Sequence, residues 1–115
     1  MLIVEDCEDI AEVMQVSLEA QGCEAIAVDS RDKALAFIRG NGLPNTIIMD
    51  LHMPGLGADE FIDKLATINP RLPRMILTTA AVDADSAAKR LNIAEVLRKP
   101  FELKSLLAQV DCCRT

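Results

Sequence analysis

Short apolar runs alternate with stretches of helical periodicity along this chain, and that alternation constrains the fold more than any other feature. The apolar runs are Met1–Val4, Cys23–Val28, Thr46–Met49, Met75–Thr78 and Ala94–Arg98. Runs of this length are typical of buried strands, whereas apolar residues three and four positions apart are typical of helices. Strands that alternate with helices form a parallel sheet with helices on both faces. The sequence therefore predicts an α/β fold with five strands and five helices.

The segments between the apolar runs carry the helical pattern. In the first segment, Ile10, Met14 and Leu18 recur at helical spacing, and Gly22 suits the left-handed residue that ends many helices. Ser30 and Asp83 each precede a later helical segment and are predicted to be N-caps. The remaining predicted helices lie around Ala34–Ile38, Ala58–Leu65, Ala84–Leu91 and Leu103–Val110.

Composition narrows the class of protein. The 115 residues contain no repeat, linker or low-complexity segment, so we expect a single domain over residues 1–115. No apolar run approaches the roughly 20 residues that cross a bilayer, and no signal-peptide pattern is present, so we expect a cytoplasmic protein without membrane contact. The net charge of −6, with three Phe and no Trp or Tyr, argues against direct nucleic-acid binding.

The four cysteines do not form a recognisable metal or redox motif. They are Cys7, Cys23, Cys112 and Cys113, and no two of them are spaced as Cys-x-x-Cys. The single histidine, His52, offers no matching His/Cys ligand set. We expect four reduced thiols without a redox role.

Polar residues follow or end four of the five predicted strands. They are Glu5 and Asp6, Asp50, Thr78 or Thr79, and Lys99. The carboxyl ends of parallel strands meet at one edge of the sheet, where ligands bind in open α/β folds. Neighbouring carboxylates stay ionised together when a cation lies among them, and a few carboxylates with room for water and phosphate oxygens suit Mg²⁺. The set predicts a magnesium site.

Asp50 is the centre of this set. It ends an apolar run, and Pro54 and Gly55 break the chain just beyond it. Asp50 either caps the next helix or does chemistry, and Pro54, four residues later, disfavours the cap. An aspartate can accept a phosphoryl group as a nucleophile, while a lysine and a hydroxyl bind the remaining phosphoryl oxygens. The sequence thus predicts a magnesium-assisted aspartyl-phosphate site.

Four motifs, in this order and spacing, resemble the receiver domain of two-component response regulators. They are Leu2–Asp6, Ile48–Gly55, Ile76–Thr78 and Lys99–Phe101, which together span essentially the whole chain. The resemblance implies a doubly wound, flavodoxin-like sheet with strand order 2-1-3-4-5. It also implies a phosphorylatable switch, which promotes only its own phosphorylation and dephosphorylation, rather than an enzyme with a separate substrate.

The resemblance implies a role for each residue of the acidic set. Asp50 would accept phosphate from a sensor histidine kinase or a phosphotransfer protein. The Mg²⁺ ligands would be Glu5, Asp6, Asp50 and the backbone carbonyl of His52. The His52 side chain itself is expected to be exposed. Phosphorylation would change a surface that binds an output domain, a partner protein or a second copy of the chain.

The other two site residues follow from the same resemblance. Thr78 would bond the phosphoryl group and Lys99 would pair with it, with a cis bond between Lys99 and Pro100. Thr79 competes with Thr78, but Thr78 fits the family spacing better, five residues after Pro73.

Two positions depart from the family pattern. Gly57 and Ala58 replace an Asp-Gly pair, and Val96 stands where the family has an aromatic switch residue. The second departure makes an aromatic relay coupled to Thr78 doubtful.

Three other functions compete with the phosphorylatable switch. A pseudo-receiver would bind partners constitutively, but every predicted site position is filled. An aspartate-nucleophile phosphatase would need a second aspartate two residues after Asp50, where His52 stands. A flavin-binding domain would need a glycine- and hydroxyl-rich phosphate loop with flanking aromatic residues, and both are missing.

Overall fold

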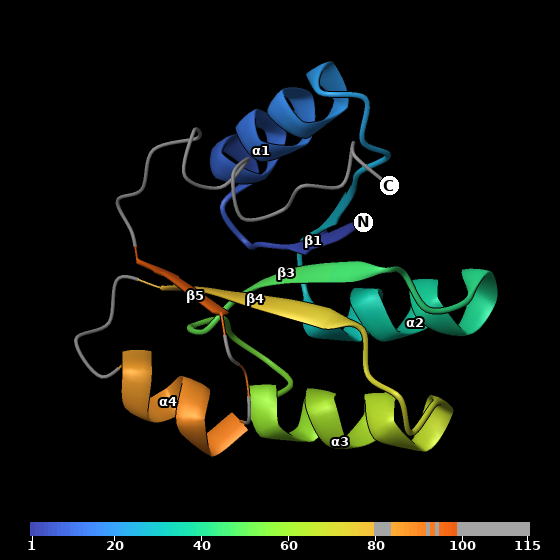
Figure 1. Ribbon diagram of the computed structural model, residues 1–115, viewed down its shortest axis with the longest axis vertical. Coiled ribbons are helices and arrows are strands. Elements are labelled where there is room, and N and C mark those ends of the chain that lie inside the picture. The colour runs from blue at the N-terminus through green and yellow to red at the C-terminus, as the bar shows by residue number, and fades with distance from the viewer. Residues whose placement is uncertain (80–83, 92, 94, 99–115) are drawn as a thin grey trace.

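The computed structural model describes residues 1–79, 84–91, 93 and 95–98 as strands, helices and their connections (Figure 1). The strands are β1 (Leu2–Val4), β2 (Ile26–Val28), β3 (Thr46–Asp50), β4 (Arg74–Thr79) and β5 (Glu95–Arg98). The helices are α1 (Glu8–Ala20), α2 (Arg31–Asn41), α3 (Ala58–Ile68) and α4 (Ala84–Leu91). The predicted alternation is confirmed over this part of the chain. The helix predicted around Leu103–Val110 and the cap predicted at Asp83 lie outside the described residues.

The five strands form one parallel sheet in the order β2-β1-β3-β4-β5. This confirms the predicted fold class and strand order. Successive side chains of a strand point to opposite faces of a sheet, so each central strand contributes to two cores. Because β1 and β3 are buried along their whole length, both read as continuous apolar runs in the sequence.

Helices cover both faces of the sheet, with α1 on one side and α2, α3 and α4 on the other (Figure 1). On the α1 face, Ile3, Ile48 and Ile76 pack with Met14 and Leu18 of that helix. The opposite core is larger. It includes Leu2, Val4, Ile47, Met49 and Leu77 from the strands, and Ala34, Ile38, Phe61, Leu65, Ala88 and Leu91 from the helices.

Two of the predicted helix ends are confirmed. The Ser30 hydroxyl accepts a hydrogen bond from the Lys33 amide at 3.1 Å, which makes Ser30 the N-cap of α2. Gly22, just beyond α1, has a φ of 86°, the left-handed conformation that glycine adopts without strain.

The expectation of four reduced thiols is wrong for Cys23. This buried residue is disulfide-bonded. No local cysteine spacing in the sequence indicates this bond. Cys7 is free and exposed, while Cys112 and Cys113 lie outside the described residues.

The strand register sets the positions of the candidate site residues. Val4 of β1 pairs with Met49 of β3, so Glu5, the next residue, lies level with Asp50 at the carboxyl edge of the sheet. Asp50 in turn pairs with Thr78 of β4. In the part of the chain that the structure describes, no helix is long and apolar enough to cross a bilayer.

Candidate functional site

Three carboxylates meet where β1 and β3 end. Glu5, Asp6 and Asp50 each offer an oxygen atom, and these atoms all lie within 4.8 Å of one another. Glu5 and Asp50 are buried, with 3% and 8% of their surfaces exposed, whereas Asp6 is exposed. The structure therefore brings together the three side chains that the sequence predicts as metal ligands. Their role as ligands stays a prediction.

Local backbone amides orient two of these carboxylates. The amide of Cys7 donates to Oε1 of Glu5 at 3.3 Å, and the amide of His52 donates to Oδ1 of Asp50 at 3.2 Å. The His52 side chain is exposed, as expected. An ionised carboxylate has about four lone-pair positions, so a hydrogen bond from an amide does not prevent the same group from binding a cation.

Thr78 lies beside Asp50 on the neighbouring strand. Residues paired across parallel strands direct their side chains to the same face of the sheet, and Thr78 is 1% exposed. Its hydroxyl donates to the Met49 carbonyl at 3.4 Å, and its own carbonyl accepts from the Leu51 amide at 2.9 Å. The β3–β4 register ends at the pair of Asp50 and Thr78, so Thr78, and not Thr79, lies opposite Asp50. The choice of Thr78 as the site hydroxyl stays a prediction.

Two further predicted features lie on or beyond β5. Lys99, the predicted partner of the phosphoryl group, lies outside the described residues, directly after the end of β5. Val96, at the position of the family's aromatic residue, is partly buried and packs against the core under α2, α3 and α4. An aliphatic side chain held in this way has no ring to rotate.

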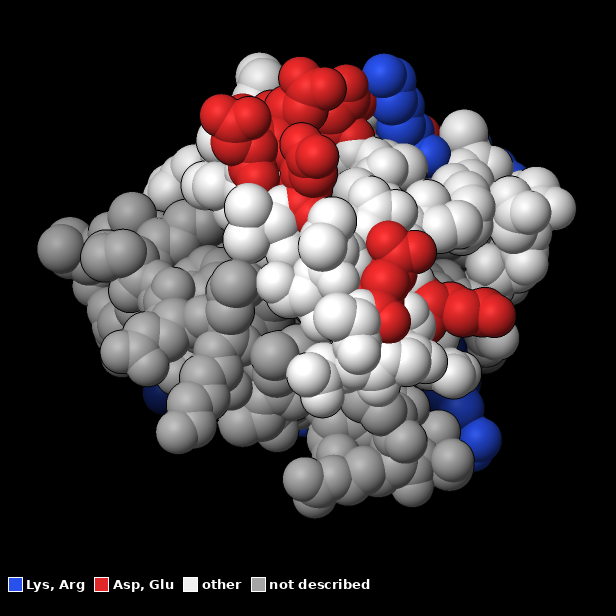
Figure 2. Space-filling view, turned by 90° about the horizontal axis from the view of Figure 1, so that it is seen from above, with Lys and Arg blue, Asp and Glu red and all other residues white. Residues whose placement is uncertain are grey.

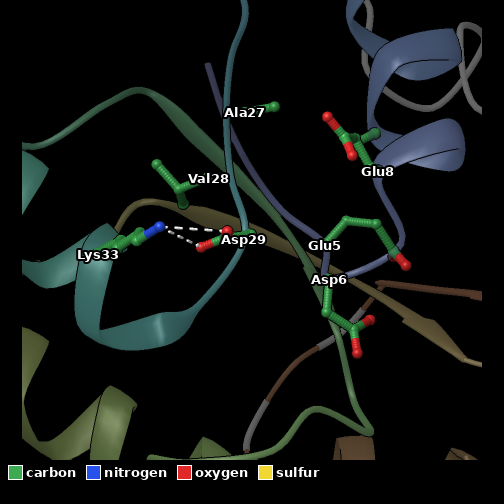
Figure 3. A pocket seen from close by; sticks show the side chains of 8 residues that line it. Glu5, Asp6, Glu8, Ala27, Val28, Asp29 and Lys33 are labelled. Carbon is green, nitrogen blue, oxygen red and sulfur yellow. Dashed lines mark hydrogen bonds and ion pairs between the residues drawn. The ribbon is translucent and has the colours of Figure 1, made fainter.

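A hollow of about 400 Å³ adjoins two of the three carboxylates, those of Glu5 and Asp6. Glu5, Asp6 and Glu8 lie on its β1–α1 side, and an ion pair between Asp29 and Lys33, 2.9 Å long, lies on its β2–α2 side (Figure 3). Seen from above, carboxylates also gather at one edge of the molecular surface, with a basic side chain next to them (Figure 2). Negative charge is therefore concentrated around the hollow.

Arg31, a residue that sequence reasoning missed, lies beneath this edge of the sheet. It is the first residue of α2 and only 2% exposed. Its Nη2 donates to the backbone carbonyls of Asp50 at 2.7 Å and Leu51 at 2.8 Å, and its Nη1 donates to that of Leu56 at 2.9 Å. Burial lowers the pKa of Arg31 from its usual value, against the opposing effect of the negative charges of Asp50 and Asp6.

The sequence does contain one signal for Arg31. It precedes Ala34, Leu35 and Ile38 by three, four and seven positions, and these three residues form the buried stripe of α2. An arginine in line with such a stripe points toward the core, where its charge needs polar partners.

Comparison of the sequence with known proteins identifies the family of this chain. Residues 1–111 match the family model described as the response regulator receiver domain. The chain is 34% identical over 108 residues to the response regulator protein FleR of Pseudomonas aeruginosa, covering 93% of this chain and 23% of that protein. It is 33% identical over 107 residues to a response regulator receiver protein of an Anaeromyxobacter species, covering 92% of this chain and 44% of that protein.

A solved structure has the same fold. The receiver domain of NtrX from Brucella abortus superposes with a TM-score of 0.81 at 24% identity, covering 99% of this chain and 98% of that chain. The present chain spans between about a quarter and a half of the length of the two curated relatives described above. Because the family match extends over most of its residues, the chain belongs to the response regulator receiver domains, the phosphorylatable switches of two-component systems.

Proposed function

We propose that Asp50 is the phosphoacceptor of this receiver domain and that residues 1–115 form a single domain. The observation that carries the proposal is the convergence of Glu5, Asp6 and Asp50 within 4.8 Å at the carboxyl edge of the sheet. Thr78, paired with Asp50 across the strands, adds a hydroxyl at the same edge. A nucleophile, a cation site and a hydrogen-bond donor thus occur together, which is the set that phosphoryl transfer requires.

The donor would be a phosphohistidine of a sensor kinase or phosphotransfer protein. A carboxylate oxygen of Asp50 attacks the phosphorus atom and forms the O–P bond. The P–N bond breaks, its electron pair stays on the imidazole nitrogen, and that nitrogen is reprotonated from solvent. The chain promotes this transfer and the later hydrolysis of its own acyl phosphate, and acts on no separate substrate.

The acidic cluster fits Mg²⁺ by the chemistry of its donors. Glu5, Asp6 and Asp50 supply hard oxygen atoms within 4.8 Å of one another, and their three negative charges repel without a cation. The backbone carbonyl of His52 is the predicted fourth protein ligand. When bound, Mg²⁺ neutralises charge that develops on the phosphoryl oxygens.

The remaining roles follow from position. We assign the bond to a phosphoryl oxygen to the Thr78 hydroxyl, and the pairing with the phosphoryl charge to Lys99. Phosphorylation adds a group of about two negative charges at Asp50. These charges draw Thr78 and Lys99 toward the site, so the loops near Asp50 and α4 shift toward a second arrangement. That surface would bind an output domain, a partner protein or a second copy, in the cytoplasm.

The test is the intact mass of the protein after incubation with acetyl phosphate and Mg²⁺. Wild type should gain one phosphoryl group, Asp50→Asn should gain none, and Asp63→Asn, which changes an exposed aspartate of α3, should behave as wild type. A full gain in Asp50→Asn would exclude Asp50 as the acceptor. The absence of any gain in wild type would favour a pseudo-receiver that binds its partners without phosphorylation.

A further inference from the structure

We propose that Arg31 is a positioning residue for phosphoryl transfer, one that holds in place the backbone segment following the acceptor. The inference rests on the proposed role of Asp50. It concerns the loop between β3 and α3, which runs from Leu51 to Gly57. That loop carries the His52 amide, which donates to Asp50, so the position of the loop affects the acceptor directly.

The guanidinium holds both ends of this loop. Nη2 bonds the carbonyls of Asp50 and Leu51, where the loop begins, and Nη1 bonds the carbonyl of Leu56, where it ends. All three distances are between 2.7 and 2.9 Å, the range of charge-assisted hydrogen bonds. One planar group therefore fixes the separation of the two ends.

We call the three hydrogen bonds of Arg31 to the loop its tether. The loop needs this tether because its own sequence does little to order it. Gly55 has a φ of 90°, and Gly57, at the N-cap of α3, offers no side chain to cap that helix. The loop also lies close to the first turn of α2. A Cβ atom added at Gly55 would lie 3.7 Å from a carboxylate oxygen of Asp32. The tether thus joins the start of α2 to the loop beside it.

Burial and charge determine which side chain can take the place of Arg31. Arginine keeps its charge when buried, and a buried charge must be compensated by hydrogen bonds. Three carbonyls supply that compensation, and the carboxylates of Asp50 and Asp6 act on the guanidinium electrostatically. A lysine carries the same charge but lacks the rigid fork, so it cannot hold both ends of the loop in the same geometry. The position therefore requires arginine.

The experiment compares Arg31→Met and Arg31→Lys with Arg39→Met, which changes an exposed arginine of the same helix. The first measurement is the rate of phosphorylation by acetyl phosphate at saturating Mg²⁺. Groups that orient a reacting site typically contribute about 10- to 100-fold. Both Arg31 variants should be slower than wild type by at least about tenfold, while Arg39→Met keeps the wild-type rate.

The second measurement is amide hydrogen exchange of the unphosphorylated proteins, and it needs no phosphoryl transfer. Loss of the tether should raise exchange in residues 51–57 and leave the amides of Ile48 and Ile76 in the core strands at their wild-type rates. A general loss of stability would raise exchange in those strands as well. If Arg31→Met does not fold, the phosphorylation rate and the amide exchange are both measured on Arg31→Lys, which keeps the charge.

The outcomes separate this inference from the proposed function. Wild-type phosphorylation rates and wild-type exchange in residues 51–57 of the Arg31 variants would overturn the positioning role. Full activity of Arg31→Lys would do the same, because charge alone would then suffice. Failure of wild type to accept phosphate would count against Asp50 as the acceptor, and the exchange measurement would still decide whether Arg31 holds the loop.

Discussion

Asp50 and Thr78 lie opposite each other on adjacent parallel strands, so one register pair supplies both the proposed nucleophile and the proposed hydroxyl. The hydroxyl is already bonded to the Met49 carbonyl, but at 3.4 Å, which is long for a hydrogen bond of this kind. A weak bond is easily exchanged for a stronger one to a charged phosphoryl oxygen. The resting structure thus holds Thr78 next to the acceptor without binding it firmly elsewhere.

This relationship predicts the behaviour of Thr78→Val. The substitution keeps the shape of a buried side chain and removes one long hydrogen bond, so the free energy of unfolding should fall by no more than about 1 kcal/mol. The variant should still accept phosphate at Asp50. It should lack the change in the amide resonances of α4 that we expect in phosphorylated wild type, because no hydroxyl binds the phosphoryl group.

Thr46→Val is the matched control, since Thr46 is also buried but lies at the opposite end of β3. It should show the wild-type response of α4. An unchanged response of α4 in Thr78→Val would assign the switch hydroxyl to Thr79 or remove the hydroxyl from the mechanism.

A second prediction concerns the edge of the sheet. Arg74 of β4 bonds Glu95 of β5 through two nitrogen–oxygen contacts of 2.7 Å each, a bidentate pair that joins the two strands. Both side chains are partly exposed, so solvent screens the pair. Glu95→Gln should lower the free energy of unfolding by about 0.5–1 kcal/mol. Urea denaturation followed by far-ultraviolet circular dichroism measures the change.

The salt dependence provides the control for this pair. The difference between Glu95→Gln and wild type should shrink in 1 M salt, where the Debye length falls to about 3 Å. Glu24→Gln, at an exposed position before β2, should leave the free energy of unfolding near the wild-type value. A difference for Glu95→Gln that does not depend on salt would assign its effect to packing instead.

The central strands and the acidic cluster could be predicted from the sequence for simple reasons. Strands buried on both faces appear as unbroken apolar runs, as in Thr46–Met49, and the ends of parallel strands meet at one edge. Those two facts were enough to predict that Glu5, Asp6 and Asp50 lie close together. The strand order required the family resemblance, because alternation alone does not say which strands are neighbours.

The buried stripe of α2 indicates that Arg31 faces the core, but the partners of its guanidinium could not be predicted from the sequence. An arginine in the first turn of a helix is usually exposed, and its burial depends on carbonyls that the loop after β3 brings to it. The disulfide at Cys23 is a second feature that no cysteine spacing in the sequence indicates. Local patterns describe single elements, whereas the contacts of Arg31 lie between elements.

A third prediction tests the larger of the two cores. Phe61 of α3 is fully buried against residues of the sheet and of α2. Phe61→Ala should lower the free energy of unfolding by about 3–5 kcal/mol, because the truncation removes apolar contacts and leaves a cavity. Phe37→Ala, which changes a partly buried residue packed at the margin of the same core, should have a smaller effect in the same urea experiment. Equal effects would contradict the assignment of Phe61 to the centre of the core.

The last prediction separates the electrostatics of the acidic cluster from its proposed use as a cation site. Asp6 lies within 4.8 Å of Glu5 and Asp50, so Asp6→Asn relieves repulsion between like charges and should stabilise the protein when no divalent cation is present. The same substitution removes a hard anionic ligand, so it should weaken Mg²⁺ binding by about tenfold, or about 1.4 kcal/mol. The two effects have opposite signs, and thermal unfolding with EDTA and with Mg²⁺ measures both.

The size of the Mg²⁺ effect follows from mass action. At a Mg²⁺ concentration about 100 times the wild-type dissociation constant, binding adds about 2.7 kcal/mol to the free energy of unfolding, and tenfold weaker binding halves that gain. Glu8→Gln is the matched control, because Glu8 lines the same hollow but does not belong to the close cluster. It should respond to Mg²⁺ as wild type does. An equal loss of response in Glu8→Gln and Asp6→Asn would mean that Mg²⁺ acts through the general negative potential of the hollow, and that Glu5, Asp6 and Asp50 form no specific site.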